Sequence, residues 1–458
     1  MAIKDRSKKF HSLRQQHPHF VYESYKIIKN KKSIHLSFEF KLSDEIVFKP
    51  ELKIPIRHFF KVEKLSDSDL NNFVFHIGMI ELISYWKATC SPQIIIKPQK
   101  LNEDQIKWWK KIYYFGLGEF FYLNNIKADQ DSFVEIISKS DCELSPVSVS
   151  LNNSIIVPIG GGKDSIVSLE ILKNKNKIRP FLLNPIEAGK NTVKTAGFST
   201  DETIVVQRFI DPKLIELNNK GNLNGHTPFS ALLAFVSIFV AALSGIRNIA
   251  LSNESSANEA TISNTKINHQ YSKSLEFETD FKEYVKKYIS EDINYFSFLR
   301  PLNELQIAKL FSGFPKYFPV FRSCNAGSKK GIWCGDCPKC LFTFIILSPF
   351  IPQIELINIF NKDLFDDKNL LPIFNQLIGI DAEKPFECVG TIEEVNAALV
   401  LTIRKQTSEN LPFLLNYYKN SLQYKSYKDI EIKELLNNYD ESNFLESKFS
   451  ELLNNIEL

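Results

Sequence analysis

Residues 154–170 read SIIVPIGGGKDSIVSLE: a run of β-forming residues, three consecutive glycines, and a segment with helical apolar spacing. This order predicts a strand that passes through a glycine turn into a helix. Such a turn presents bare backbone amides at a helix N-terminus, where the helix dipole and free N–H groups favour an anion. The stretch matches neither the Walker loop, which closes with Gly-Lys-Ser/Thr, nor the dinucleotide fingerprint Gly-x-Gly-x-x-Gly. It therefore predicts a phosphate-binding turn of a different kind.

The region around this turn alternates strands with helices. Short apolar runs follow one another from residue 151 onward as SIIVPI, IRPFLLNP, ETIVVQRFI and RNIALSNE, and helical segments such as 164–174 and 229–243 separate them. This alternation predicts an α/β fold with a doubly wound parallel sheet. Ligands bind such sheets at the carboxyl ends of the strands. We therefore expect the residues that follow three of the strands to converge, namely 160–165, 184–187 and 252–259.

The segments on either side have other patterns. Residues 33–42, SIHLSFEFKL, alternate apolar and polar residues and predict a half-buried strand. Residues 70–87 and 104–123 have helical spacing, and Asn102 is a candidate cap for the second helix. After Cys340 the apolar segments have helical spacing. We therefore expect an N-terminal α+β domain over 1–150, an α/β domain over 151–345 and a C-terminal helical domain over 346–458.

Charge and hydropathy exclude some classes of partner. The chain has 56 Lys and Arg against 53 Asp and Glu, a formal net charge of +3, so no strong field attracts it to nucleic acid or to anionic membrane. Residues 1–20 are basic but lack the apolar stretch of a secretory signal, and we expect a cytoplasmic protein. We expect neither nucleic acid nor membrane as a partner, and the sequence leaves the oligomeric state open.

One segment approaches the composition of a membrane span. The eighteen residues 229–246 carry no charge, whereas a span needs roughly 20 apolar residues. Three serines, Ser230, Ser237 and Ser244, recur every seven residues and form a weakly polar stripe along one helical face. No second span accompanies the segment. We therefore expect a helix that is buried against the sheet.

The glycine turn carries side chains suited to an anion and a cation. Glycines allow a close backbone approach, Lys163 adds positive charge, and Ser165 adds a hydroxyl donor. Asp164 can cap the helix or help to hold a cation. The alternative is a tight strand-to-helix turn with no ligand, but such a turn needs no third glycine followed by Lys-Asp-Ser.

Four of the seven cysteines are clustered. Residues 322–340 read RSCNAGSKKGIWCGDCPKC, with the spacing C-x9-C-x2-C-x2-C, and the four cysteines are Cys324, Cys334, Cys337 and Cys340. Four thiolates this close in sequence predict a closed tetrahedral zinc site. An iron–sulfur cluster is the competing metal, and unligated reduced cysteines are the remaining alternative.

The glycine turn resembles the pyrophosphate-binding loop, Ser-Gly-Gly-x-Asp-Ser, of the ATP pyrophosphatases, also called the PP-loop superfamily. These enzymes cleave ATP between its α and β phosphates and transfer AMP to an oxygen of the substrate. The resemblance implies that the turn holds the β and γ phosphates through Gly160, Gly161, Gly162, Lys163, Asp164 and Ser165, with Mg²⁺ shared between phosphate oxygens and Asp164. Gly160 departs from the pattern, which has Ser there. The cysteine spacing resembles the zinc cluster of the cyanodeazaguanine synthases in this group, which favours zinc.

A second set of polar residues follows the predicted strand 247–254. It consists of Asn253, Glu254, Ser255 and Asn258. Because this strand belongs to the same predicted sheet as the glycine turn, we expect these side chains to face the nucleotide or the substrate. A polar surface loop without a ligand has a similar composition, and this alternative stays open.

Longer stretches resemble the UDP-N-acetylmuramoyl-L-alanyl-L-glutamate epimerases. They span most of the chain and read GLGEFFYLNNI, NGHTPFSALLAF, LSNESSANEATISNTKINHQYSKSLEFE, WCGDCPKC and KPFECVGTIEEVNAAL. The resemblance implies an ATP-dependent isomerase that takes UDP-MurNAc-dipeptide as substrate. It inverts the terminal L-glutamate to D-glutamate for peptidoglycan biosynthesis and releases AMP and diphosphate.

This reaction is chemically coherent. The α proton of a carboxylate is barely acidic, because its removal places a second negative charge beside the first. Formation of an acyl-adenylate removes the first charge, so the α carbon can lose its proton and regain one on the other face. The candidate proton carriers are His226, His269, Tyr271, Lys273 and Cys388, the last near a capping box that begins at Thr391. Two groups on opposite faces are needed, and the sequence does not select the pair.

Two other functions fit parts of the pattern. One is an enzyme of the same superfamily that adenylates a tRNA base or a free nucleobase, such as a thiolase or a cyanodeazaguanine synthase. The low net charge and the lack of a recognisable RNA-binding module weigh against it. The other is a nucleotide-binding regulator without turnover, which only the Gly160 departure supports.

Overall fold

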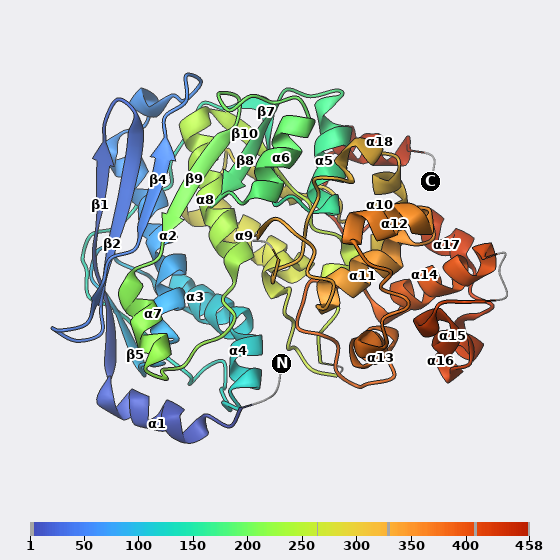
Figure 1. Cartoon of the computed structure of the whole chain (residues 1–458). Coiled ribbons are helices and arrows are strands. Elements are labelled where there is room, and N and C mark those ends of the chain that lie inside the picture. The colour runs from blue at the N-terminus through green and yellow to red at the C-terminus, as the bar shows by residue number, and fades with distance from the viewer. Residues whose placement is uncertain (1–3, 263, 328–329, 407–409, 457–458) are drawn as a thin grey trace. The chain divides into compact units, whose positions relative to one another are not determined.

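The computed structural model describes residues 4–262, 264–327, 330–406 and 410–456, and Figure 1 shows the elements along the chain. The fold is mixed α/β, with a large central sheet and a helical C-terminal region. The chain forms two compact units whose segments interleave in sequence. Unit 1 comprises residues 1–156, 204–249 and 266–295, and unit 2 comprises 157–203, 250–265 and 296–458. The division into three consecutive domains stays a prediction.

The sheet in unit 1 begins with antiparallel strands, drawn in blue and green in Figure 1. They lie in the order β9 (Ile204–Phe209), β4 (Glu51–Pro55), β2 (Ser33–Lys41) and β1 (His19–Lys29), and the short β3 (Val47–Phe48) also pairs with β2. Two parallel strands, β5 (Gln93–Ile96) and β6 (Glu135–Ser138), continue beyond β1. The predicted alternation in β2 is confirmed, because Ile34, Leu36, Phe38 and Phe40 are buried.

Helices of unit 1 pack on this framework. They are α1 (Ser7–Gln16), α2 (Asp67–Trp86), α3 (Glu103–Gly116), α4 (Gly118–Leu123), α7 (Pro212–Asn219), α8 (Phe229–Ser244) and α9 (Leu275–Tyr288). Asn102 caps α3 as predicted, with its side chain accepting from the Gln105 amide. The predicted helix 104–123 is interrupted at Leu117, between α3 and α4. Helix α8 is buried along almost its whole length, and within the described residues no helix has the length and apolar content that a membrane crossing requires.

The predicted α/β strands are present, but the sheet is mixed rather than parallel throughout. Strands β7 (Asn152–Pro158) and β10 (Ile246–Leu251) pair in parallel, whereas β9 pairs antiparallel with β4. A strand edge carries unpaired N–H and C=O groups, and a partner of either direction satisfies them. A further strand, β11 (Asn294–Ser297), comes later in the chain. The parallel part agrees with the sequence, and the antiparallel β9–β4 pair corrects it.

Unit 2 contains the glycine turn and the C-terminal helices. The first part holds α5 (Lys163–Lys173), β8 (Ile178–Leu183) and α6 (Glu187–Thr195). The helices that follow are α10 (Glu304–Ser312), α11 (Pro338–Leu347), α12 (Gln353–Phe360), α13 (Leu371–Ile378), α14 (Ile392–Lys405), α15 (Phe413–Lys419), α16 (Leu422–Tyr427), α17 (Ile432–Asn437) and α18 (Ser447–Asn454). Helices α11, α13 and α14 pack on one another, which confirms the predicted helical C-terminal region.

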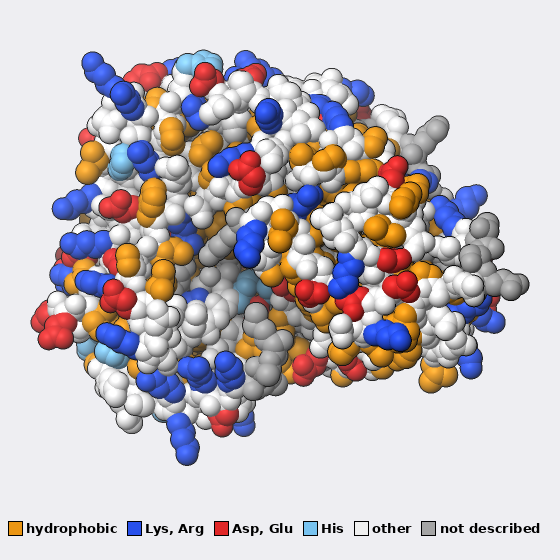
Figure 2. All heavy atoms as spheres, viewed as in Figure 1, with side chains coloured by type: hydrophobic (Ala, Val, Ile, Leu, Met, Phe, Trp, Pro, Cys, Tyr) orange, Lys and Arg blue, Asp and Glu red, His pale blue; other side chains and the backbone are white. Residues whose placement is uncertain are grey.

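Surface charges of both signs are mixed. Figure 2 shows Lys and Arg side chains interspersed with Asp and Glu over the visible face, without a large basic area. This agrees with the formal net charge of +3.

Candidate functional site

The glycine turn joins β7 to α5 and is closely packed at two of its three glycines. Gly161 has a φ of +93°, and a Cβ there would lie 2.7 Å from the Ala188 carbonyl carbon and from the Gly189 amide nitrogen. A Cβ on Gly162, the N-cap of α5, would lie 3.3 Å from the Ser323 Cβ. The start of α6 therefore lies against the turn, as the predicted convergence of 160–165 with 184–187 requires.

Gly160 has a different environment from its two neighbours. It is exposed, its φ is not positive, and no described residue has an atom within 4 Å of a Cβ built there. The position therefore accepts the Ser of the superfamily pattern without steric cost. Relative to the pattern that the sequence resembles, Gly160 lacks the Ser hydroxyl.

Lys163 lies in the predicted turn, but its ammonium group faces two carboxylates. It is almost completely buried and forms ion pairs with Asp164 and Glu304. Burial acts to lower the pKa of Lys163, and the two carboxylates outweigh it and raise that pKa above its usual value. Ser165 is also internally satisfied, because its Oγ donates to the Gly162 carbonyl at 2.9 Å. Both side chains are therefore held by contacts within the protein.

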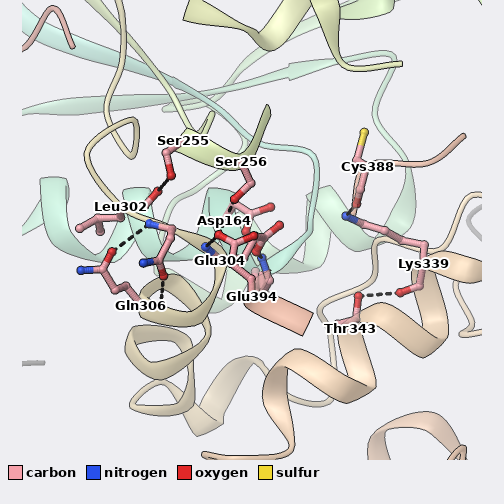
Figure 3. A network of polar contacts seen from close by, with 12 residues as sticks. Asp164, Ser255, Ser256, Leu302, Glu304, Gln306, Lys339, Thr343, Cys388 and Glu394 are labelled. Carbon is pink, nitrogen blue, oxygen red and sulfur yellow. Dashed lines mark hydrogen bonds and ion pairs between the residues drawn. The ribbon is translucent and has the colours of Figure 1, made fainter. Parts of the chain in front are cut away.

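Two glutamates extend this network, as Figure 3 shows. Burial raises the pKa of Glu304 to about 8, although Lys163 opposes the rise. The Glu304 amide donates to Glu394 Oε1 at 2.9 Å, and the Ser256 hydroxyl donates to the same oxygen at 2.6 Å. Glu394 also completes the predicted capping box with Thr391 at the start of α14. The network thus ties the glycine turn to α10, to α14 and to the loop after β10.

The loop after β10 holds the second predicted set of ligands. Asn253 Nδ2 donates to Ser297 Oγ at 3.0 Å, and the Ser255 amide and hydroxyl both donate to the Leu302 carbonyl at 3.1 Å. Glu254 is buried, and its carbonyl accepts from Arg300 Nη1 at 2.6 Å. The other member of the set, Asn258, is exposed. Ser256 connects the loop to the glycine turn only indirectly, through Glu394 and Glu304, and most of the loop's polar groups hold the loop itself.

The four clustered cysteines converge on one point. The Sγ atoms are 3.7 Å apart for Cys324 and Cys337, 3.7 Å for Cys334 and Cys340, and 3.5 Å for Cys337 and Cys340, and all four lie within 4.8 Å of one another. Zn–S bonds of about 2.3 Å in a tetrahedron separate the sulfurs by about 3.8 Å. An iron–sulfur cluster distributes its thiolates over several irons and spreads them more widely. The arrangement fits a single tetrahedral ion.

The sulfurs also stabilise a thiolate. Hydrogen bonds from Cys340 first, and then from Cys334 and Cys324, lower the pKa of Cys337 to about 5. The Gly327 amide donates to Cys324 Sγ at 3.1 Å. Thiolates are the form that binds zinc, so the site is chemically suited to this ion.

The segment before the cysteines contacts the glycine turn. The Arg322 amide donates to the Gly161 carbonyl at 2.8 Å, and Ser323 packs against Gly162. The backbone just before Cys324 therefore contacts the glycine turn directly.

Cys388 lies in a loop that is held by its backbone. Lys339, near the start of α11, donates to the Cys388 carbonyl, and Figure 3 shows the Cys388 sulfur on the far side from this contact. Asn325 Nδ2 donates to Glu387 Oε2 at 2.6 Å, so the neighbouring residue is tied to the cysteine segment. The thiol is partly exposed. The structure thus presents Cys388 on a supported loop of unit 2.

The two predicted histidines lie together in unit 1, on either side of a carboxylate. Glu119 Oε2, in α4, is 2.5 Å from His269 Nδ1 and 3.4 Å from His226 Nδ1, and the two imidazole centroids are 4.6 Å apart. The Glu119 side chain is 5% exposed, and those of His269 and His226 are 12% and 23% exposed. Burial first, and then the positive charges of His269, Lys87 and Lys273, lower the pKa of His226 to about 3.

Tyr271 and Lys273 follow in a short 3₁₀ turn, η3 (Tyr271–Lys273). Tyr271 is 4% exposed, its ring lies 5.1 Å from that of Phe115, and its hydroxyl has no hydrogen-bond partner within the described part of the chain. Burial raises the pKa of Tyr271. Lys273 is half-buried near His226. The structure therefore brings His226, His269 and Lys273 together and gives Tyr271 the surroundings of a core residue.

Three acidic residues in these networks were not predicted as site residues. Glu119 lies in GLGEFFYLNNI, a stretch used only for the family resemblance, and Glu304 follows the capping residue Asn303. Glu394 was predicted, but only as part of a capping box. An acidic residue in a helical sequence resembles any solvated position, and only the packed structure shows that these three are buried.

Two family models match the sequence. One is described as the MurL N-terminal domain and matches residues 11–298, and the other is described as the MurL C-terminal domain and matches residues 320–430. Together with the geometry above, these matches cover the histidine cluster, the glycine turn and the cysteine cluster.

Three similar proteins carry the name UDP-N-acetyl-alpha-D-muramoyl-L-alanyl-L-glutamate epimerase. The chain is 35% identical to the one from Micromonospora sp. over 340 residues, 72% of this chain and 74% of that protein. It is 33% identical to the one from Xanthomonas oryzae pv. oryzae over 344 residues, 73% and 75% of the two chains. It is 36% identical to the one from Salinispora tropica over 333 residues, 71% and 72% of the two chains. No solved structure matches the chain.

Proposed function

From the premise that this chain belongs to the MurL family, we propose that it is an ATP-dependent epimerase that converts the terminal L-glutamate of UDP-N-acetylmuramoyl-L-alanyl-L-glutamate to D-glutamate. The epimerase activity is the one named for all three relatives. The adenylation alternative that takes a tRNA base or a nucleobase has no support among these names. The product serves peptidoglycan biosynthesis.

The glycine turn is the single observation that carries the ATP requirement. Positive φ at Gly161 and close packing at Gly161 and Gly162 give a narrow turn whose amides open onto the N-terminus of α5. This geometry suits the diphosphate part of a nucleotide. We assign the β and γ phosphates of ATP to Gly160, Gly161, Gly162 and Ser165, and a Mg²⁺ ion to the side of Asp164. Such a PP-loop site gives AMP and diphosphate as the products of ATP cleavage.

The network around Lys163 changes the role first given to that residue. Its ammonium group pairs with Asp164 and Glu304, so we propose that it organises the turn and leaves the phosphates to the backbone amides. We propose that the nearby loop after β10 lines the site for the nucleotide or the substrate. Its polar residues are Asn253, Glu254, Ser255 and Asn258. The role of Lys163 and the role of this loop are both proposals, and both concern unit 2.

A structural zinc ion fits the cysteine site. The four thiolates of Cys324, Cys334, Cys337 and Cys340 would hold it, because their separations match one tetrahedral ion. Zinc in a closed four-thiolate site contributes folding free energy and no open coordination position. Its role here is to fix the segment that contacts the glycine turn through Arg322.

Activation of the glutamate makes its α proton removable. Once the carboxylate is joined to AMP, the carbonyl withdraws electrons, and a base of ordinary strength can take the proton. The candidates remain His226, His269, Lys273 and Cys388, with Tyr271 the weakest because burial raises its pKa. Hydrolysis of the acyl-adenylate then frees the D-glutamyl product.

A direct assay tests this function. The protein is incubated with UDP-MurNAc-L-Ala-L-Glu, ATP and Mg²⁺, AMP is quantified, and the glutamate enantiomers are resolved after acid hydrolysis. We expect AMP and D-glutamate together, and we expect neither from Asp164→Ala, with Asp164→Asn as a control for the size of the side chain. AMP without D-glutamate would contradict the epimerase activity, and no AMP with this substrate would favour a regulator without turnover.

The same assay tests Cys388. The Lys339 contact is made by the Cys388 carbonyl, so Cys388→Ala removes the thiol without removing the contact that holds the loop. Full epimerisation by Cys388→Ala would remove this residue from the candidates. Loss of epimerisation with AMP release intact would place the thiol in the proton transfer.

A further inference from the structure

We infer that Glu119 is a positioning residue, which fixes the tautomer of His269 so that His269 and His226 form one acid–base group for a single face of the substrate α carbon. The inference rests on the proposed epimerase function. Glu119 is not among the residues that the sequence pattern indicates, and its role follows from the contacts of the histidine cluster.

The first step is the hydrogen bond between Glu119 and His269. Their Oε2 and Nδ1 atoms are 2.5 Å apart, and the carboxylate side chain is 5% exposed. A carboxylate oxygen accepts, so the hydrogen lies on Nδ1 of His269 and the lone pair lies on Nε2. A buried carboxylate that orients an imidazole in this way also stabilises the imidazolium that forms when Nε2 takes a proton. His269 is thereby prepared as a base at Nε2.

The second step concerns the direction of the two imidazoles. Nδ1 of His226 lies 3.4 Å from the same Glu119 oxygen, and the ring centroids are 4.6 Å apart. Because both Nδ1 atoms turn toward one oxygen, the two Nε2 atoms point away from it and cannot face each other across a substrate carbon. Epimerisation needs a base on one face and an acid on the other. The histidine pair therefore serves one face, and the opposite face needs a group outside this cluster.

The third step is the charge around the cluster. The charged and titratable groups that bear on His226 are Glu119, His269, Lys87 and Lys273, and Lys87 also donates to the Gly225 carbonyl. Two ammonium groups oppose a further cation at this position. Ligand atoms around a metal with bonds of about 2.1 Å lie about 3 Å apart or more, which is longer than the Glu119–His269 separation. The separation is therefore that of a hydrogen bond from His269 Nδ1 to the carboxylate.

The proton balance is simple. The Cα–H bond of the activated glutamate breaks, its electron pair stays on the substrate, and the proton forms a bond with Nε2 of His269. Glu119 stays ionised and pairs with the imidazolium. A proton from the group on the opposite face then bonds to Cα, that group regains a proton from solvent, and His269 releases its own proton to solvent. No oxidant or reductant is required.

The test compares Glu119→Gln with wild type in D₂O and follows two products at once. AMP release reports substrate activation, and deuterium at the glutamate α carbon reports proton transfer. We expect Glu119→Gln to keep AMP release and the KM for the substrate, and to lose deuterium incorporation and D-glutamate formation by about 100-fold or more. Glu119→Asp should recover part of the loss. Glu276→Gln, which removes an exposed carboxylate of the same unit, should match wild type.

Two further readouts separate positioning from a merely structural role. ¹⁵N NMR of histidine-labelled wild type should show His269 protonated at Nδ1. In Glu119→Gln the loss of the carboxylate makes the imidazolium less stable, so the acidic limb of the kcat/KM profile should move to lower pH. A uniform loss of rate at every pH, together with a lower Tm, would instead show that Glu119 only supports the fold.

Other outcomes would overturn the inference in different ways. Full deuterium incorporation by Glu119→Gln would show that the carboxylate is not needed. A stoichiometric metal ion that is lost in both Glu119→Gln and His226→Ala would replace the Glu119–His269 hydrogen bond by a metal site. If wild type itself forms no AMP with this substrate, the proposed function fails, and that result is distinct from a failure confined to the Glu119 variants.

Discussion

The backbone N–H of Arg322 donates to the carbonyl oxygen of Gly161 at 2.8 Å. This bond connects the segment that enters the cysteine site with the middle glycine of the turn. Ser323 adds a packing contact with Gly162. The segment that enters the cysteine cluster therefore contacts the glycine turn, although the two are about 160 residues apart in sequence. We therefore expect loss of the metal to weaken nucleotide binding.

Removal of one zinc ligand tests this coupling. We expect Cys337→Ser to lose a single equivalent of zinc, to lower Tm and to weaken ATP binding by about 10-fold or more, because the turn loses its support. Metal analysis and calorimetric titration with ATP measure both effects. Cys142→Ser is the matched control, since Cys142 is exposed and lies outside the cluster. Zinc loss with unchanged ATP affinity would show that the Arg322–Gly161 bond does not transmit the effect.

Two glycines of the turn, Gly160 and Gly161, should respond differently to substitution. Gly161→Ala places a Cβ 2.7 Å from backbone atoms at positive φ, and we expect a cost on the order of 1–3 kcal/mol and loss of AMP formation. Gly160→Ser has open space around it and should change stability by less than about 0.5 kcal/mol. It should also keep AMP formation, because the superfamily pattern has Ser there. Equal damage from both variants would contradict the description of the turn.

The raised pKa of Glu304 predicts a pH dependence of stability. A carboxyl that keeps its proton in the folded state up to a pKa of about 8 stabilises the protein fully below its ordinary pKa, and the contribution falls as pH rises toward 8. The free energy of unfolding should therefore decline between pH 5 and 8 by up to about 1.4 kcal/mol per pH unit from this group. Glu304→Gln, which is neutral at every pH, should have a flatter profile in denaturant unfolding.

The matched control for this measurement is Glu276→Gln. Glu276 is largely exposed and pairs with Lys111, so its replacement should leave the wild-type slope in place. A Glu304→Gln profile as steep as that of wild type would show that Glu304 is already ionised in the folded protein. Its pairing with Lys163 would then outweigh its burial.

Tyr271 should be dispensable for proton transfer. Its hydroxyl is buried, burial raises its pKa, and its ring lies 5.1 Å from Phe115 and 6.1 Å from Phe277. We expect Tyr271→Phe to keep D-glutamate formation within about 3-fold of wild type, since the aromatic packing is preserved. Chiral analysis of the product measures this. A loss of D-glutamate formation comparable to that of a His269→Ala variant would make Tyr271 a candidate for proton transfer again.

The features that could be predicted from the sequence are those that depend on residues close together in the chain. The strand–glycine–helix order, the half-buried alternation of β2, the cap at Asn102 and the capping box at Thr391 depend on neighbouring residues, and the structure confirms each of them. The four cysteines have ligand spacing within one short segment, so their convergence was also accessible. The mixed direction of the sheet was not, because the pairing of β9 with β4 joins segments about 150 residues apart.

The sequence by itself determined the glycine turn at a helix start and the cluster of four cysteines, because both features depend on residues that are close together in the chain. Only the tertiary structure decided what the charged side chains do. Lys163 looks like a phosphate ligand in the sequence, yet burial beside Glu304 and Asp164 makes it an internal counter-ion. Glu119 has no signal in the sequence, and it becomes significant because folding buries its carboxylate between His226 and His269. Burial and partner choice depend on residues far apart in the chain, and these two properties determine how an ionisable group behaves.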